Sequence, residues 1–212
     1  MRITKWEHAC LDIELGGQRL IIDPSHYAVS LANFDKIAAV VVTHVHADHY
    51  DKANLQKIVA ANPSVKILTT QEVVQDFDNP AAQAVQADQT YQAGPFNLQF
   101  FGGQHATILE NYPINQNWGV LVNQQVYYPG DSLVDCATDY KALGVPVMAP
   151  WLKFSEAAAM VSASSAKVIF PMHNGFVNDE GQALYDRLLG GVAKSSGQQY
   201  QPLAVGDSFE IL

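Results

Sequence analysis

Thr43-His44-Val45-His46-Ala47-Asp48-His49 is the stretch that decides the fold, because three imidazoles and a carboxylate directly follow the apolar run 38–42. Such polar groups at the end of a buried strand are unfavourable unless a cation binds there. Neutral imidazole suits zinc, iron and similar ions, and carboxylates complete such sites. In extended chain, His44 and His46 point to the same face because they are two residues apart. The stretch therefore predicts a metal site at the end of a strand.

Three further metal-grade residues follow other predicted strands. They are His105 after 100–104, Asp131 after 127–130, and His173 after 168–172. In open α/β sheets, ligand sites collect where strands end, and Gly103 and Gly130 allow the backbone to turn sharply there. Each residue alone also fits a loop or a turn. Their co-occurrence with the run 43–49 favours a single shared site.

Composition predicts a compact protein. The 212 residues are 48% hydrophobic and 16% charged, which fits one domain over residues 1–212. A net charge of −9 disfavours nucleic acid as a partner. No stretch approaches the ~18 apolar residues of a membrane span, and the first residues lack a signal-peptide core. Cys10 and Cys136 favour a reducing compartment, with a single disulfide as the alternative. These features predict a cytoplasmic protein.

The order of predicted elements indicates sheets covered by helices. Residues 9–15 alternate in polarity, and Gly16-Gly17 then separates them from 19–23, which predicts a hairpin. Residues 51–61 and 72–77 suit helices around a strand at 66–69, an order typical of a mixed or parallel sheet. The second half repeats this plan without a sequence repeat. Its predicted strands are 96–101, 118–122, 126–128, 145–148, 167–170 (ending at Pro171) and 203–211; its predicted helices are 137–143, a helix from a Ser155 cap to Ala163, and 181–192.

With Asp23 at the end of strand 19–23, these motifs resemble those of the metallo-β-lactamase-fold hydrolases over nearly the whole chain. That family has a strand-end Asp, an H-x-H-x-D-H run, a later His, a Gly-Asp pair and a final His. All are present here in that order. The resemblance implies an α/β protein with a four-layer αβ/βα sandwich: two facing mixed β-sheets with helices on both outer sides.

The resemblance also implies how the ligands divide between two ions. His44, His46 and His105 would hold the first ion. Asp48, His49 and His173 would hold the second, and Asp131 would bridge both. Asp23 would orient a ligand histidine, as metal-bound imidazoles usually require. The cofactors implied are two divalent metal ions, zinc foremost; manganese and iron are alternatives because the set contains no cysteine.

A narrower likeness links the chain to a compact bacterial branch that includes the ascorbate-6-phosphate lactonase. It is carried by Trp6-Glu7-His8-Ala9 and Ile21-Ile22-Asp23-Pro24. Glu7 stands where that branch has glycine. The lactonase is also substantially longer, so its substrate is not expected to transfer.

The ligand set predicts hydrolysis of a small soluble substrate. Two ions ~3.5–4 Å apart can share a bridging hydroxide, because a bound divalent ion lowers the pKa of water from ~15.7 to near 7. The expected substrate is a lactone, ester or phosphoester. Asp48 is the candidate proton shuttle. His8 either lines the pocket, donates to a leaving group, or is only structural. For Tyr27, Trp151 and Phe154, core packing is favoured over a place in the pocket wall.

Two alternatives stay open at this point. A nuclease or phosphodiesterase of the same fold predicts a basic groove, which a chain of charge −9 does not suggest. A non-catalytic metal-binding protein would be free to lose ligands, yet the set is complete. We expect a small-molecule substrate with neither nucleic acid nor membrane as partner. The sequence leaves the oligomeric state open.

Overall fold

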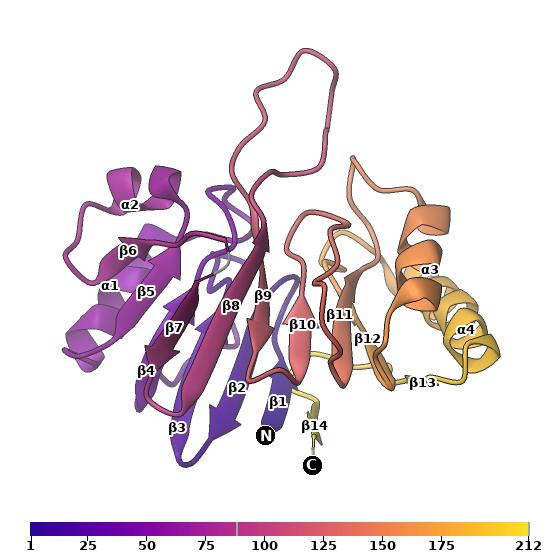
Figure 1. The fold of residues 1–212 in the computed structure, drawn as a ribbon, viewed down its shortest axis with the longest axis horizontal. Helices are drawn as coiled ribbons and strands as arrows, with labels where there is room; N and C mark the ends of the chain where they lie inside the picture. The colour runs from indigo at the N-terminus through magenta and orange to yellow at the C-terminus, as the bar shows by residue number, and fades with distance from the viewer. Residues whose placement is uncertain (88, 212) are drawn as a thin grey trace.

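Two seven-stranded β-sheets face each other in the computed structural model, which describes residues 1–87 and 89–211 (Figure 1). The first sheet contains β1 (Arg2–Lys5), β2 (Leu11–Leu15), β3 (Gln18–Ile22), β4 (Ile37–Val41), β5 (Lys66–Thr69), β6 (Ala82–Ala84) and β14 (Ser208–Glu210). The second contains β7 (Thr90–Ala93), β8 (Phe96–Gly102), β9 (Trp118–Val122), β10 (Val126–Tyr128), β11 (Ala142–Pro146), β12 (Val168–Met172) and β13 (Gln199–Tyr200). The described helices are α1 (Lys52–Ala61), α2 (Gln71–Phe77), α3 (Phe154–Ala163) and α4 (Asp179–Ser195).

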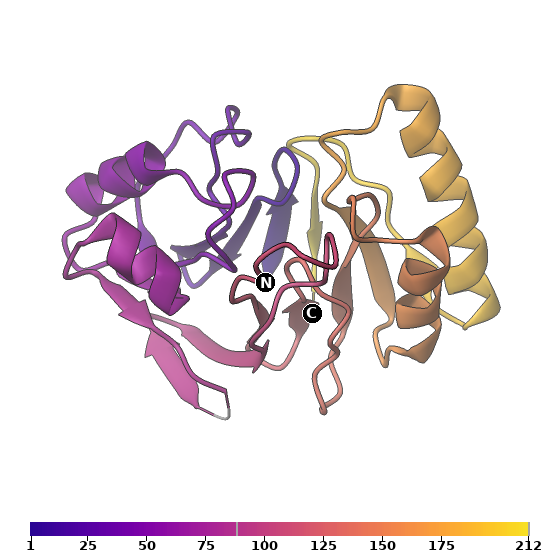
Figure 2. The same ribbon diagram turned by 90° about the horizontal axis from the view of Figure 1, so that it is seen from above.

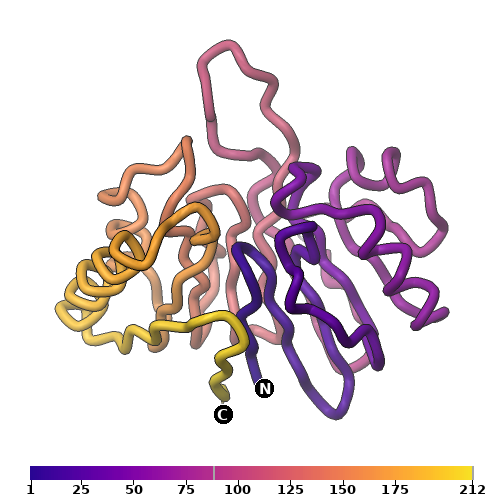
Figure 3. Tube along the Cα trace, turned by 180° about the vertical axis from the view of Figure 1, so that it is seen from behind, coloured from indigo at the N-terminus to yellow at the C-terminus, as the bar shows by residue number. Residues whose placement is uncertain are grey.

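The two sheets are built alike. Strand order is β14-β1-β2-β3-β4-β5-β6 in the first and β13-β12-β11-β10-β9-β8-β7 in the second. In each, hairpins give antiparallel neighbours first, and longer connections then add parallel strands, as strand geometry requires. The last strand, β14, returns to pair with β1, so the two ends of the chain lie side by side (Figure 3).

Three apolar layers hold the sheets and helices together. Between the sheets, residues such as Ile13, Phe96 and Phe170 form the central core. One outer layer joins α1 and α2 to the first sheet, and the other joins α3 and α4 to the second. Figure 2 shows the helices on opposite flanks of the paired sheets. This is the four-layer αβ/βα sandwich that the resemblance implied.

Most elements follow the predicted pattern. The Gly16-Gly17 hairpin forms with Leu15 opposite Gln18, and Asp51 caps α1 by accepting a hydrogen bond from the Asn54 amide (2.7 Å). Among the described residues, no helix is both long and apolar enough to cross a bilayer. Cys10 and Cys136 are free and buried, so the disulfide alternative does not hold.

Three local predictions in the second half are wrong. The predicted helix 137–143 is instead irregular chain followed by β11, whose five residues are all buried between parallel neighbours. The helix α3 begins before Ser155, with Lys153 at its cap position. Strand β12 continues through Pro171 to Met172. Proline is tolerated there because β13 pairs only with Val168 and Ile169, which leaves that side of β12 free further on.

Lys5 yields a stability prediction, because its side chain is almost fully buried and donates only to the Trp6 carbonyl (3.0 Å). Burial lowers the pKa of Lys5 from 10.5 to about 8. Between these values the unfolded chain binds more protons, so the free energy of unfolding rises with pH. We expect Lys5→Met to stabilise the fold by about 2 kcal/mol at pH 7 and to remove this rise.

Urea unfolding at pH 7 and pH 10 measures both effects. The matched control is Lys57→Met on the exposed face of α1, where we expect a change within about 0.5 kcal/mol at either pH. A destabilised Lys5→Met protein with an unchanged pH slope would contradict the assignment.

Candidate metal centre

The predicted site residues all lie at one edge of the paired sheets. Asp23 follows β3, the run 43–49 follows β4, and one residue each follows β8, β10 and β12. These three are His105, Asp131 and His173. His8 lies in the turn between β1 and β2, and His173 N donates to its carbonyl (3.0 Å). Residues scattered from 8 to 173 therefore come together because the two sheets end their strands at the same edge.

The side chains form overlapping groups of potential ligands. Within each group, the ligand atoms lie within 4.8 Å of one another. The groups are His44, His46 and His105; His44, His49 and Asp131; and His8, Asp48, His49 and His173. The first group equals the set implied for the first ion. The last contains the set implied for the second ion plus His8. The carboxylate of Asp131 lies between them, with Oδ1 3.1 Å from His49 Nε2 and Oδ2 3.4 Å from His105 Nε2.

In each of five histidines, one ring nitrogen points away from the other candidate ligands and is held there by a hydrogen-bond partner. His49 Nδ1 donates to Asp23 Oδ2 (2.7 Å), His105 Nδ1 to the Ala106 carbonyl (2.6 Å), and His173 Nδ1 to the Met148 carbonyl (2.5 Å). His46 Nε2 donates to Asn115 Oδ1 (3.2 Å). His44 Nδ1 donates to Thr43 Oγ1 (3.1 Å), whose own proton goes to Asp23 Oδ2. These hydrogen-bond partners determine which nitrogen of each ring carries the proton.

The remaining nitrogen of each ring faces its neighbours as a potential ligand. In the described residues, His49 Nε2, His105 Nε2, His173 Nε2 and Asp131 Oδ1 are buried without any hydrogen-bond partner. Buried polar atoms are normally paired, and unpaired ones call for an ion or a function. Outer partners that fix a tautomer are the usual support of metal-bound imidazoles. The residues therefore fit two divalent cations.

The charge balance of the site favours cations. Burial opposes ionisation of Asp131, yet nearby His49 and His173 outweigh it and hold the pKa of Asp131 well below its usual range. Burial likewise opposes charge on His173, but Asp131 and Asp48 raise the pKa of His173 to about 9. In the metal-free protein, protons thus occupy positions that cations would take. Metal binding is expected to release protons.

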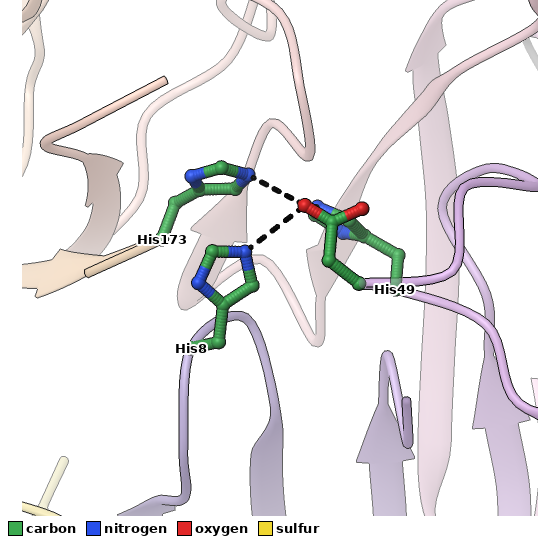
Figure 4. Close-up of side chains that lie close together, drawn as sticks. His8, His49 and His173 are labelled. Atoms are coloured by element: carbon green, nitrogen blue, oxygen red, sulfur yellow. Dashed lines mark hydrogen bonds and ion pairs between the residues drawn. The ribbon is translucent and has the colours of Figure 1, made fainter. Parts of the chain in front are cut away.

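His8 differs from the other five rings. The Gly175 amide donates to His8 Nδ1 (3.0 Å), so this nitrogen carries a lone pair and the neutral ring has its proton on Nε2. Burial lowers the pKa of His8 to about 4, which keeps the ring neutral at pH 7. His8 Nε2 donates to Asp48 Oδ2 (3.2 Å), the oxygen that His173 Nε2 also approaches at 3.5 Å (Figure 4). His8 therefore presents a donor to the site and not a lone pair.

Three non-glycine residues at this edge have a strained backbone. His8, Asp23 and His173 have φ values of 56°, 50° and 56°, which non-glycine residues seldom adopt. Gly130 has φ 62°, and a Cβ there would collide with Asn117 and lie 2.9 Å from Thr43 Cβ. Strained residues of this kind persist where the surrounding structure enforces them, commonly at functional sites.

A cavity of about 330 Å³ opens beside the ligands. His46, Asp48, His105, Asp131 and His173 reach it from the candidate site, and the rest of its wall is mostly aromatic or apolar. Two residues for which core packing was favoured, Tyr27 and Trp151, line this cavity, so that interpretation is wrong for them. Phe154 instead stacks on Tyr185. His8 is absent from the cavity wall and lies buried behind Asp48.

Sequence reasoning missed three polar supports of the site. Trp151 Nε1 donates to Asp131 Oδ2 (2.9 Å), and Asn117 Oδ1 accepts from the Asp131 amide (3.0 Å). Asn115 fixes His46 as described above. Each is a single residue in an irregular segment, so no periodic or spaced signal marks it.

Comparison with known proteins agrees with this geometry. The beta-lactamase superfamily domain profile matches residues 2–173. Protein Rv0786c of Mycobacterium tuberculosis is 27% identical over 190 residues, covering 87% of this chain and 89% of that protein. A UPF0173 protein of Pyrococcus furiosus is 25% identical over 183 residues, covering 82% and 84%. Igni18, a metallo hydrolase from Ignicoccus hospitalis, superposes with a TM-score of 0.75 at 17% identity, covering 100% and 99%.

The fold and the histidine–aspartate cluster define a metallo-β-lactamase-fold protein. The chain belongs to the beta-lactamase superfamily, and its histidines and aspartates form groups that could hold metal ions.

Proposed function

We propose that this chain is a dinuclear hydrolase, with zinc as the foremost metal, that cleaves a small lactone, ester or phosphoester. The observation that carries the proposal is the common arrangement of five histidines, each with its outer nitrogen fixed and its inner nitrogen turned toward other candidate ligands. His44 Nε2, His46 Nδ1 and His105 Nε2 would hold one ion. Asp48, His49 Nε2 and His173 Nε2 would hold the other, and Asp131 would serve both.

Ions bound there supply Lewis acidity: they lower the pKa of water to about 7 and polarise the bond to be cleaved. The chain's own residues then manage the protons. Asp48 Oδ2 accepts from His8, whereas no hydrogen bond within the described residues holds Asp48 Oδ1. Because Asp48 reaches the cavity, we assign it the transfer of a proton from the attacking water to the leaving oxygen. The net reaction of an ester is addition of water to give an acid and an alcohol.

Trp151 keeps the shared carboxylate in place. Its indole N–H, bound to Asp131 Oδ2, prevents rotation of the carboxylate, and its ring forms part of the cavity wall. Trp151 therefore contacts both the carboxylate that would serve the two metals and the cavity that would hold the substrate.

Metal reconstitution tests the proposal. Protein treated with chelator and reloaded with Zn²⁺, Mn²⁺ or Fe²⁺ is assayed against lactones, carboxylic esters, phosphodiesters and single-stranded nucleic acid. We expect turnover of a small substrate to return with metal. Tight metal binding without turnover of any substrate would favour the non-catalytic alternative, and turnover of nucleic acid alone would favour the nuclease.

His8 is assigned the role of a positioning residue, acting through Asp48. We expect His8→Ala to lower kcat by about 10–100-fold, in the range of outer partners of metal ligands, while metal content stays unchanged. His8→Gln, whose amide nitrogen can replace Nε2 as donor, is expected to recover part of the loss. Metal content measured by mass spectrometry separates the roles: loss of one bound ion in His8→Ala would make His8 a ligand and contradict the assignment.

We also propose a reducing location, such as the cytoplasm. Its support is the pair of buried free thiols, Cys10 and Cys136. Cell fractionation tests it; recovery of the native protein outside the cell would contradict it.

A further inference from the structure

Within residues 1–87 and 89–211, the cavity beside the candidate site offers no Lys or Arg side chain to a substrate. The chain has 12 Lys and Arg residues, and none of them is among the described residues that line the cavity. Apart from the candidate ligands, the wall is formed by His26, Tyr27, Ala47, Ile108, Pro150, Trp151 and Phe176. A substrate part that extends away from the ligands therefore meets mainly aromatic rings and aliphatic groups.

The wall has few free hydrogen-bond donors. The Trp151 indole N–H is already used by Asp131 (2.9 Å), and His26 Nδ1 is bound to the Ala47 carbonyl (2.7 Å). The Tyr27 hydroxyl has no hydrogen-bond partner among the described residues. An anionic group held against this wall, away from the candidate ligands, would find no Lys or Arg partner in the part of the chain that the structure describes.

Exposed apolar side chains occur at Phe176 of the cavity wall and on the loop that carries Ile108. Phe176 is 46% exposed although its ring contacts His8 and Tyr27, with centroids 4.7 and 5.6 Å away. Ile108 lies on the loop that joins β8 to β9, which projects beyond the sheet edges in Figure 1. The same loop exposes Leu109, Tyr112 and Ile114, which are 64%, 56% and 52% exposed.

From this wall we infer that the substrate is a compact, uncharged ester or lactone whose non-reacting part is apolar or aromatic. This inference rests on the proposed hydrolase function and narrows its substrate class. The cavity volume of about 330 Å³ is at the small end of ligand sites, which favours a small molecule. A phosphorylated or carboxylated tail is disfavoured because this wall, as far as it is described, provides no Lys or Arg side chain to pair with it.

Matched substrate pairs test the inference. Ethyl phenylacetate and an aryl-substituted γ-butyrolactone are each compared with the same compound carrying a ring sulfonate, using zinc-loaded protein. We expect kcat/KM to be at least about 10-fold higher for the uncharged member of each pair. Equal or faster turnover of the sulfonates would overturn the inference while leaving the hydrolase function intact.

Binding of inert analogues decides the same question without turnover. Isothermal titration with the aryl lactam and its sulfonate is expected to give at least about 10-fold tighter binding of the uncharged lactam. If no ester, lactone or phosphoester is hydrolysed, the proposed function fails, and the lactam preference still tests the character of the wall. Tighter binding of the sulfonate would refute the inference.

A charge introduced into the wall is expected to change the preference. Ile108→Lys places an ammonium group at the cavity, so the sulfonate should gain about 10-fold in relative kcat/KM and in lactam affinity. Leu109→Lys is the matched control on the same loop, because Leu109 is absent from the wall. We expect it to change the preference by less than about twofold. Equal gains in both variants would show a general surface charge effect and contradict the assignment of the wall.

Discussion

Asp131→Asn is expected to lower kcat/KM by about 10³-fold, equivalent to about 4 kcal/mol of transition-state stabilisation. Asp131 is buried between the two halves of the site, with His49 Nε2 at 3.1 Å and His173 Nε2 at 3.2 Å from its oxygens. The substitution keeps the shape but removes the one negative charge placed to serve both ions. Steady-state kinetics and metal analysis of the same preparation measure the loss.

The matched control is Asp139→Asn, eight residues further on and exposed. It makes the same chemical change outside the site and is expected to leave both kinetics and metal content unchanged. Wild-type activity in Asp131→Asn, with both ions retained, would show that this carboxylate does not hold the metals.

Asp23→Asn is expected to weaken metal binding by about 10–100-fold, although Asp23 is not itself a metal ligand. The buried carboxylate of Asp23 accepts from the Thr43 amide (2.7 Å), from Thr43 Oγ1 (2.8 Å) and from His49 Nδ1. An amide NH₂ facing His49 would oppose the Nδ1 proton. The ring would relieve this conflict by moving its proton to Nε2, where it blocks coordination. The disrupted buried network should also destabilise the metal-free protein by about 2 kcal/mol.

Zinc titration calorimetry gives the affinity, and ¹⁵N NMR of the histidine rings gives the tautomer. Asp51→Asn serves as control, because asparagine caps a helix as well as aspartate and Asp51 caps α1. An unchanged His49 tautomer together with undiminished zinc affinity would refute the role given to Asp23.

The sequence predicted the first half of the fold more accurately than the second. In 9–23, alternating polarity and a Gly-Gly turn together specify a hairpin. Residues 142–146 are buried on both faces of a parallel sheet, and such a short apolar run does not distinguish a strand from a helix. The register of its neighbours, which no local pattern encodes, decides the outcome.

The candidate site was also predictable only in part. The grouping of His44, His105 and His173 followed from strand-end histidines that fit a known motif order. The role of His8 did not follow, because its tautomer is set by the amide of Gly175, 167 residues away in the sequence. A Cβ at Gly175 would lie 2.8 Å from His8 Nδ1. Contacts of this kind between distant loops become visible only when the two sheets are assembled.

Anomalous diffraction from crystals of the zinc-loaded protein tests the central claim most directly. We predict two peaks about 3.5–4 Å apart. One should lie about 2.0–2.1 Å from the inner nitrogens of His44, His46 and His105, and the other at the same distance from those of His49 and His173. A single peak bound to His8 Nε2, or zinc bound only outside this edge of the sheets, would contradict the account.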